Sequence, residues 1–391
     1  MPLHANPGAE TVLAAARPSR APLAFHRALP GYAPTPLRAL PRLAARCRVG
    51  GVWLKDESAR LGLPAFKILG ASWAVCALLA ERLGLSTLGG DLPELARRLA
   101  GEPMLVAATD GEYGRAVART AALLALPARI FLPAGAAPAR VAAIQSEGAS
   151  VTVLDGSYDE AVAAAAATAR REGALLVQDT GWSGYLEVPD RIAEGYATLF
   201  WEIDEQLAAA GARAPSLAVV QVGVGALAQA AVVHWKAASR AAAPRLLGVE
   251  PWDAACVLAA LRAGEIVTLP GRQRSLMAGL NCGTASATAW PWLRRGLDGV
   301  VTVDDEGARA AVRALADEGV VAGETGAAGA AALIALGDDE AARAALGLDA
   351  RSEVLLLSTE GATDPASWRA IVGREPPALD SGRSGDADTP A

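Results

Sequence analysis

The chain has 391 residues, of which 52% are hydrophobic and 20% are charged, and its formal net charge at pH 7 is −6. This length allows a large core and suggests about two domains. The acidic balance, with no basic patch among interleaved aromatics, argues against nucleic acid or an anionic membrane surface as the main partner.

Membrane insertion, secretion and metal binding find no support in the sequence. No apolar run approaches the ~20 residues that span a bilayer, and the N-terminus lacks the basic-then-apolar order of a signal peptide. The four cysteines have irregular spacing and the three histidines are scattered, so neither a disulfide framework nor a metal-ligand pattern is present. We therefore expect a cytoplasmic, metal-free globular enzyme.

The first part of the chain contains one candidate catalytic lysine, Lys67. Residues 1–35 carry Pro and Ala with little periodicity, which predicts an irregular arm, and a strand is expected over 51–58. Lys67 then lies between apolar neighbours, just before a helical pattern that ends near Gly84. A lysine in apolar surroundings loses the hydration of its ammonium form, so its free amine becomes available to attack carbonyls. Lys67 is therefore a candidate Schiff-base lysine; the ordinary alternative is that it extends to solvent.

Residues 86–180 predict a parallel sheet. A connecting insertion with one amphipathic helix is expected over 86–101, and strands over 104–108, 128–132, 151–154 and 174–178 alternate with helices. Such alternation indicates helices on both faces of the sheet and a ligand beyond the carboxyl ends of its strands. The loops 109–114 and 179–182 follow two of these ends.

A glycine loop follows the next buried strand. After a long helix over 192–210 and a strand over 217–222 comes Gly223-Val224-Gly225-Ala226-Leu227, and then a helix over 228–238. Free backbone N–H groups and the positive end of that helix suit a phosphate. A dinucleotide fold would need a third glycine, although Glu250 partly mimics its acidic partner. We expect a single phosphate, with a nicotinamide cofactor and simple strand–helix packing as alternatives.

The last part of the chain completes the pattern for one cofactor. A strand over 245–250, a region of further helices and a buried strand over 354–357 lead to Ser358. A buried lysine and one phosphate cradle are the minimum for pyridoxal phosphate, and Ser358 offers a hydroxyl for its ring nitrogen. A neutral partner does not hold the pyridine protonated, which favours prompt loss of a β-leaving group. The tail beyond about 375 is expected to be disordered.

Eight motifs, in chain order between about residues 35 and 370, belong together. They are Ala65-Phe66-Lys67, Ala108-Thr109-Asp110-Gly111-x-x-Gly114-Arg115, Gln178-Asp179-Thr180-x-Trp182-x-Gly184-Tyr185, Glu194-Gly195-Tyr196, Val222-Gly223-Val224-Gly225, Gly279-Leu280-Asn281-Cys282-Gly283-Thr284, Gly323-Glu324 and Ser358-Thr359-Glu360-Gly361-x-Thr363-Asp364-Pro365. This set resembles the diaminopropionate ammonia-lyase family of fold-type II (tryptophan synthase β-like) pyridoxal-phosphate enzymes.

The resemblance implies an activity and catalytic roles. Members convert 2,3-diaminopropionate, often both enantiomers, to pyruvate and two ammonia molecules. Lys67 would form the Schiff base and take the α-proton from the L-isomer, and Asp110 would take it from the D-isomer. Asp179 resembles the acid that binds or protonates the departing amine. From the residues alone, each aspartate has the alternative role of a helix N-cap.

The resemblance also implies an architecture: two parallel-sheet α/β domains with the cofactor in the cleft between them, and a homodimer. The large domain would combine 36–84 with 190–370, the small domain would span 85–189 and close over substrate, and 371–391 would form the disordered tail. The implied cofactor contacts are Phe66, Lys67, Glu112, Gly223, Val224, Gly225, Ala226, Leu227, Ser358 and Thr359.

The chain departs from the family at one loop. The family usually carries Asp-Gly-Asn-His-Gly, whose amide donates a hydrogen bond to the 3′-oxygen of the cofactor, whereas Glu112 and Tyr113 replace the Asn and His here. An ionised glutamate only accepts hydrogen bonds, so the electronics of the cofactor imine should differ. Ala226 also stands where relatives often have serine.

Three alternatives remain open, and the substitutions at Glu112 and Tyr113 favour the first. The first is a β-eliminase, dehydratase or β-replacement enzyme for serine, threonine or another β-substituted amino acid. The others are a non-catalytic cofactor-binding relative and a nicotinamide dehydrogenase. Cys256 and Cys282 flank the predicted site; we expect thiols, with a disulfide between them as the alternative.

Overall fold

The computed structural model describes residues 3–85, 92–109, 111–240 and 243–377. Asp110, part of the predicted insertion and the tail from residue 378 lie outside the described residues. Within the described part of the chain, no helix is long and apolar enough to cross a membrane.

The strands are β1 (His4–Ala5), β2 (Leu37–Ala39), β3 (Gly51–Asp56), β4 (Leu105–Ala108), β5 (Ala128–Leu132), β6 (Ser150–Val153), β7 (Leu175–Leu176), β8 (Leu217–Gln221), β9 (Arg245–Pro251), β10 (Gly299–Val303) and β11 (Glu353–Ser358). The helices are α1 (Ala21–Arg27), α2 (Pro41–Cys47), α3 (Ile68–Arg82), α4 (Leu92–Leu99), α5 (Glu112–Leu123), α6 (Pro138–Gln145), α7 (Tyr158–Glu172), α8 (Glu187–Gly195), α9 (Ala197–Ala209), α10 (Ala226–Trp235), α11 (Cys256–Ala263), α12 (Trp290–Gly296), α13 (Asp305–Asp317), α14 (Glu324–Gly337), α15 (Glu340–Leu346) and α16 (Pro365–Val372). Two short 3₁₀ helices are η1 (Trp252–Ala254) and η2 (Ala278–Leu280).

The larger sheet has the order β1-β10-β9-β8-β11-β3-β2. Its five inner strands are parallel, and the two edge strands β1 and β2 run antiparallel. Every residue of β8 and β10 is buried, as expected of parallel strands covered by helices on both faces. The carboxyl ends of β8 and β11 bring Gln221 and Ser358 to the same edge of the sheet.

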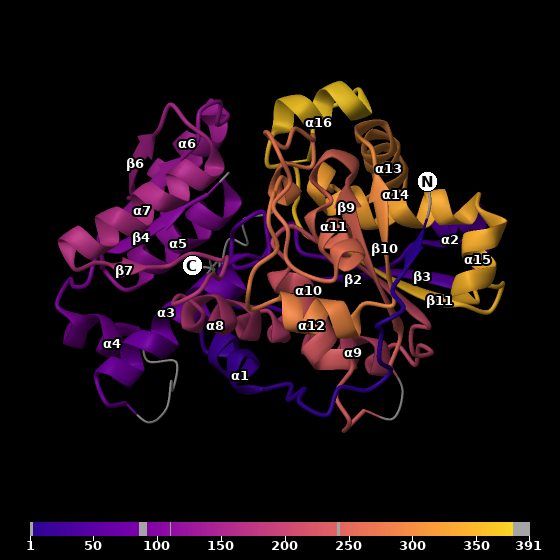
Figure 1. Ribbon diagram of the computed structural model, residues 1–391, viewed down its shortest axis with the longest axis horizontal. Helices are drawn as coiled ribbons and strands as arrows, with labels where there is room; N and C mark the ends of the chain where they lie inside the picture. The colour runs from indigo at the N-terminus through magenta and orange to yellow at the C-terminus, as the bar shows by residue number, and fades with distance from the viewer. Residues whose placement is uncertain (1–2, 86–91, 110, 241–242, 378–391) are drawn as a thin grey trace, which may run out of the picture.

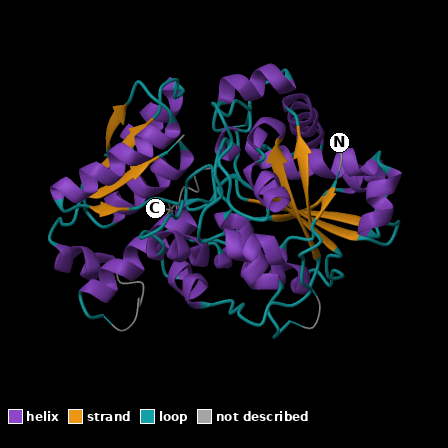
Figure 2. Ribbon diagram, in the orientation of Figure 1, coloured by secondary structure: helices purple, strands orange, loops and turns teal. Residues whose placement is uncertain are grey.

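The smaller sheet is fully parallel, in the order β6-β5-β4-β7. Figures 1 and 2 show the two sheets as separate bodies, each flanked by helices, with α3 and α8 between them. The predicted α/β class with two parallel sheets is confirmed. The domain boundaries stay a prediction.

Three expectations from the sequence differ from the structure. The arm over 1–35 is not wholly irregular, because it supplies β1 and α1. The helix expected over 192–210 is two helices, α8 and α9. A Cβ at Gly195 would lie 2.5 Å from the Leu69 carbonyl, so α8 approaches α3 closely just before the break. The region after 280 contains β10 as well as helices.

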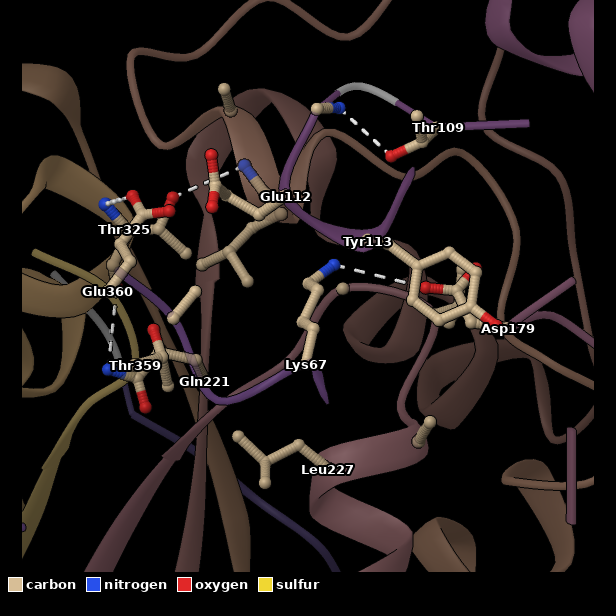
Figure 3. A pocket seen from close by; sticks show the side chains of 18 of the residues that line it. Lys67, Thr109, Glu112, Tyr113, Asp179, Gln221, Leu227, Thr325, Thr359 and Glu360 are labelled. Atoms are coloured by element: carbon tan, nitrogen blue, oxygen red, sulfur yellow. Dashed lines mark hydrogen bonds and ion pairs between the residues drawn. The ribbon is translucent and has the colours of Figure 1, made fainter. Parts of the chain in front are cut away.

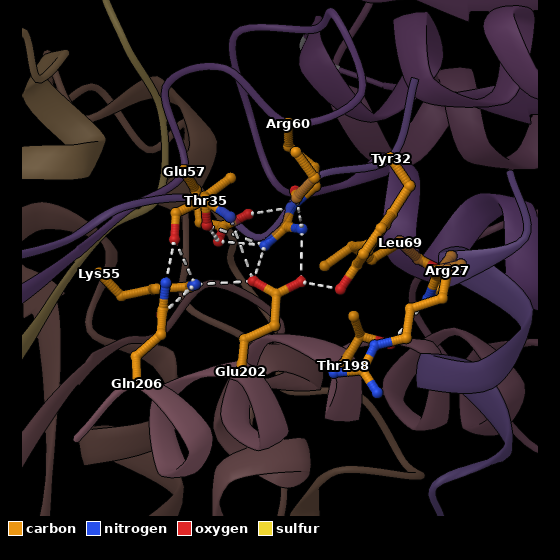
Figure 4. A network of polar contacts seen from close by, with 12 residues as sticks. Arg27, Tyr32, Thr35, Lys55, Glu57, Arg60, Leu69, Thr198, Glu202 and Gln206 are labelled. Carbon is orange, nitrogen blue, oxygen red and sulfur yellow. Dashed lines mark hydrogen bonds and ion pairs between the residues drawn. The ribbon is translucent and has the colours of Figure 1, made fainter. Parts of the chain in front are cut away.

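A buried charge network, shown in Figure 4, anchors the chain just before the lysine loop. Arg60 lies 2.7 Å from both Glu57 and Glu202, and Lys55 lies 2.7 Å from Glu202. The Thr35 carbonyl and Gln206 accept the remaining hydrogen bonds of the Lys55 ammonium. Although burial acts to raise the pKa of Glu202, its bonds to Arg60 and Lys55 lower it, so the group is ionised. The network therefore joins the arm, β3 and α9 through fully paired charges.

Candidate active site

A cavity opens between the two sheets, at the carboxyl ends of their strands (Figure 3). The smaller body contributes loops after β4 and β7, the first turn of α5 and parts of α6 and α7, and the larger body contributes the rest. The lining residues are Ala65, Phe66, Lys67, Thr109, Gly111, Glu112, Tyr113, Arg140, Tyr158, Asp179, Tyr196, Gln221, Gly223, Val224, Gly225, Ala226, Leu227, Ala278, Gly279, Leu280, Cys282, Thr325, Thr359 and Glu360.

Lys67 stands immediately before α3, with 22% of its side chain exposed. The Phe66 N–H donates to the Thr359 carbonyl at 3.3 Å, which holds the loop against the end of β11. The Lys67 Nζ lies 3.9 Å from the Asp179 Oδ2 and 5.8 Å from the centre of the Tyr113 ring. The amine therefore points into the cavity and does not extend to open solvent.

Asp179 is the described carboxylate paired with that amine. The helix that follows it, α8, begins eight residues later at Glu187 with Leu186 as its N-cap, so Asp179 does not act as a cap. Burial raises the pKa of Asp179, and the Lys67 charge opposes that rise. A carboxyl group that holds a proton closer to neutrality suits proton transfer at a substrate.

The glycine loop forms the floor of the cavity. Gly225 is the N-cap of α10 with φ +105°, in the left-handed region that favours glycine, and no side chain caps the helix. The first N–H groups of α10 are thus left for a ligand, and the positive end of the helix favours an anion. Gly223, Val224, Ala226 and Leu227 line the cavity beside it, as the sequence predicts for a phosphate.

Four buried polar atoms of residues in the cavity wall have no partner among the described residues. They are the Tyr113 hydroxyl, the Arg140 Nε, the Gln221 Oε1 and the Thr359 hydroxyl. The Gln221 Nε2 donates to the Leu357 carbonyl at 2.7 Å, which fixes the orientation of its amide. Buried polar atoms are expensive when unpaired, so the cavity is built for a polar ligand. A lysine, a phosphate cradle and these atoms together fit pyridoxal phosphate.

The end of β11 differs in detail from the sequence expectation. Ser358 is fully buried and is not among the lining residues; its hydroxyl donates to the Glu360 carbonyl at 3.4 Å. The neighbouring Thr359 lines the cavity and carries the unpartnered hydroxyl. Of the two predicted contacts, Thr359 is the one whose hydroxyl is available to a ligand.

Glu112 shares the cavity wall with a second acid, Glu360. Burial raises the pKa of Glu112, while Arg115, Arg140 and Lys67 act to lower it. Burial and then the Glu112 carboxyl raise the pKa of Glu360 to about 7, whereas Arg140 and a 3.3 Å bond from the Thr325 N–H lower it. The Glu112 carboxyl therefore lies near Arg140 and near a second acid, Glu360, whose pKa is also raised.

The sequence analysis missed several lining residues: Arg140, Tyr158, Tyr196, Gln221, Thr325 and Glu360. The sequence offers a clue to Gln221, because it is the polar residue near the end of an apolar strand that leads into the glycine loop. It offers none to Arg140, since only the folded arrangement brings α6 to the cavity. Its side chain packs on Gly111, where a Cβ would lie 2.7 Å from the Arg140 Cδ.

Cys256 and Cys282 carry thiols and form no disulfide in the described chain, as expected. The Cys256 thiol is buried and donates to the Gly223 carbonyl at 3.6 Å, and burial raises its pKa well above the ordinary value. It therefore supports the glycine loop in its neutral form.

Comparison with known proteins gives consistent matches. The model of the family "Pyridoxal-phosphate dependent enzyme" matches residues 28–360. The diaminopropionate ammonia-lyase of Salmonella typhimurium is 38% identical over 368 residues, covering 90% of each chain. The Escherichia coli diaminopropionate ammonia lyase in complex with D-serine superposes with a TM-score of 0.88 at 32% identity, covering 95% of this chain and 96% of that chain. The same enzyme with an aminoacrylate-PLP azomethine reaction intermediate gives 0.85 at 33% identity, with the same coverage.

Proposed function

The chain belongs to the pyridoxal-phosphate dependent enzymes, and within them to the diaminopropionate ammonia-lyase family; on that premise we propose that it converts 2,3-diaminopropionate and one water to pyruvate and two ammonia molecules. Pyridoxal phosphate is its cofactor. The observation that carries the proposal is identity of 38% over 90% of both chains, with Lys67 and the glycine loop in one cavity.

The lysine and the aspartates of the site have different roles in the reaction. When bound, pyridoxal phosphate supplies the electron sink that makes the α-proton of the substrate acidic. The Lys67 amine holds the cofactor and, once free, accepts the α-proton of the L-isomer. Asp110 would accept the α-proton of the D-isomer. Asp179, 3.9 Å from the Lys67 amine, binds the departing β-amine and keeps it protonated as it leaves.

Binding is assigned to the remaining residues. The loop from Gly223 to Leu227 and the first turn of α10 hold the phosphate. Thr359 would offer its unpaired hydroxyl to the cofactor, and Phe66, which packs on Tyr196 with ring centres 4.7 Å apart, supports the lysine loop. Glu112 would, in its protonated form, donate to the cofactor the hydrogen bond that an amide gives in relatives. We also propose a homodimer in the cytoplasm.

The test is release of pyruvate and ammonia by purified, cofactor-loaded protein given D- and L-2,3-diaminopropionate separately. We expect release from both isomers in a one-to-two ratio, loss of both activities in Lys67→Ala, and loss of the D-isomer activity alone in Asp110→Asn. If the cofactor-loaded protein releases pyruvate and ammonia from neither isomer, diaminopropionate is not its substrate.

The Glu112 and Tyr113 substitutions favour one second candidate, a β-eliminase for serine, threonine or another β-substituted amino acid. Such an enzyme would use the same lysine and glycine loop. A substrate panel separates the two: keto-acid release from serine or threonine at a kcat/KM above that for diaminopropionate would choose the second.

A further inference from the structure

A second cleft, of about 430 Å³, lies away from the cavity and shares no lining residue with it. Its walls come from residues 15–19 of the arm, from α8 with the first residue of α9, from α10 and from Trp292 of α12. Figure 1 shows α8, α10 and α12 side by side at the front of the larger body. The wall from α10 consists of Gln229, Ala230, Val233 and His234, whose spacing places them on one helix face.

Two side chains in this wall carry buried polar atoms without a partner. Gln229 is 4% exposed and His234 is fully buried, and both the Gln229 Oε1 and the His234 Nδ1 lack a hydrogen bond among the described residues. Leaving a buried polar atom unpaired is energetically unfavourable. Two such atoms in one cleft therefore indicate a ligand that pairs with them.

Both atoms are hydrogen-bond acceptors. The Gln229 Nε2 donates to the Asp190 Oδ1 at 2.7 Å, and because a carboxylate only accepts, this bond fixes the amide with its oxygen unpaired. The His234 Nε2 lies 2.9 Å from the Asp204 Oδ2 and 3.2 Å from the Arg240 Nη1. Because a carboxylate only accepts, we assign the ring proton to Nε2, which leaves the Nδ1 lone pair unpaired. Burial lowers the pKa of His234, against the effect of Asp204, so the ring is neutral.

The two arginines of the cleft are hydrogen-bonded within the protein. Arg17 donates to the carbonyls of Ala14 and Ala16. Arg191 donates to Glu81 and Glu194. The carboxylates of Glu187, Asp190 and Glu194 outnumber these two arginines, and an aromatic residue, Trp292, completes the wall. The unpaired acceptors therefore favour a ligand with N–H donors, and the carboxylates and the aromatic face favour one with positive charge.

We propose that this cleft, walled by Gln229, His234 and Trp292, binds a small molecule through a primary ammonium group. The ammonium N–H groups donate to the Gln229 Oε1 and the His234 Nδ1. The charge is balanced by the carboxylates of α8. The ligand is either the free ammonium ion or the amino group of an amine or amino acid, and the proposal does not depend on the reaction carried out in the cavity.

The test is isothermal titration calorimetry on the cofactor-loaded protein with propylammonium chloride, ammonium chloride and glycine. Tetramethylammonium chloride, a cation without N–H donors, is the comparison. The cofactor absorbance, recorded in parallel, reports any amine that enters the catalytic cavity instead. We expect saturable heat from at least one N–H cation, none from tetramethylammonium, and no accompanying change in absorbance.

Two variants locate the site. Gln229→Leu and His234→Phe should each weaken binding about tenfold or more, since each removes one acceptor of a charged donor. The same exchange at the exposed Gln145 of α6, Gln145→Leu, is the control and should leave affinity unchanged. Circular dichroism confirms folding, and if His234→Phe does not fold, Gln229→Leu decides alone.

The outcomes separate the sources of the ammonium group. Binding of ammonium chloride alone assigns the free ion, binding of propylammonium assigns an organic amine, and tighter binding of glycine assigns an amino acid. No binding of any N–H cation, equal binding of tetramethylammonium, or unchanged affinity in Gln229→Leu would overturn the proposal. None of these results changes the expected release of pyruvate.

Discussion

The charge network of Figure 4 and the cavity of Figure 3 lie a few residues apart in the chain and treat buried polar groups in opposite ways. In the network, Arg60, Glu57, Lys55 and Glu202 are almost fully buried, and every charge has a partner at 2.7 Å. In the cavity, four polar atoms have no partner among the described residues and the closest ion pair is 3.9 Å long. Complete pairing indicates a structural role, and incomplete pairing indicates a place kept for a ligand.

The strongest test of the comparison removes the lysine from the cavity. Lys67→Ala should lower turnover of diaminopropionate by at least about 10⁴-fold, because no other described side chain in the cavity offers an amine. Its free energy of unfolding should stay within about 0.5 kcal/mol of wild type, since Lys67 completes no buried network. Pyruvate assays and urea unfolding measure the two quantities. A large loss of stability would place Lys67 with the structural residues instead.

The reverse experiment breaks the network. Glu202→Gln should destabilise the fold by about 3–5 kcal/mol, because Arg60 and Lys55 then lose a charged partner while buried. The partly exposed Glu205 of the same helix, which pairs with Arg20 and Arg27 at the surface, provides the control: Glu205→Gln should change stability by less than about 1 kcal/mol. Urea midpoints measured under one set of conditions test both, and equal effects would contradict the assigned roles.

Removal of the acid beside the lysine should weaken catalysis without unfolding the protein. Asp179→Asn should lower kcat by about 10²-fold or more with a smaller change in KM, because the amide neither holds nor releases a proton. Steady-state kinetics on both isomers measure the effect. An unchanged kcat would mean that Asp179 only balances the charge of Lys67.

The raised pKa of Glu360 predicts a dependence of stability on pH. With its pKa raised to about 7, Glu360 binds a proton in the folded state at pH values where the unfolded chain has lost it. Its contribution to stability is therefore full below about pH 4.5 and falls by about 1 kcal/mol per unit as pH rises to 7. The cofactor-free protein should show this decline, and Glu360→Gln should make it shallower; the buried Glu250, whose pKa is raised to about 8, leaves a remaining decline. A decline as steep in the variant as in the wild type would assign it to other groups.

The smallest expected effect concerns Glu112. Glu112→Asn restores an amide that donates a hydrogen bond at every pH, so the midpoint of the cofactor's absorbance titration should shift by about one unit. Turnover should change by only a few fold. If the titration and turnover are both unchanged, the Glu112 side chain does not face the cofactor.

The sequence predicted the parts of this molecule that depend on local chemistry. Alternation of apolar strands and helices predicted the smaller parallel sheet, the family resemblance implied the second, and the residues around Lys67 and Gly225 indicated the lysine loop and the phosphate loop. It could not place Arg140, because α6 reaches the cavity only through the packing of the two bodies. The same limit applies to Ser358 and Thr359: periodicity locates the end of β11 but not which hydroxyl the following turn directs into the cavity.

The position of β11 in the larger sheet also sets an order of assembly. β11 pairs with β3 on one side and with β8 on the other, so Leu54 meets Leu356 across about 300 residues of chain. During synthesis, the apolar edges of β3 and β8 must wait until almost the whole chain has left the ribosome, whereas β4 to β7 can pair among themselves much earlier. A chain that stops before residue 353 lacks β11, the strand that joins β3 to β8. It therefore exposes the unpaired edges of β3 and β8, which are sites for aggregation. The catalytic cavity is therefore completed last, and only chains that extend beyond β11 acquire it.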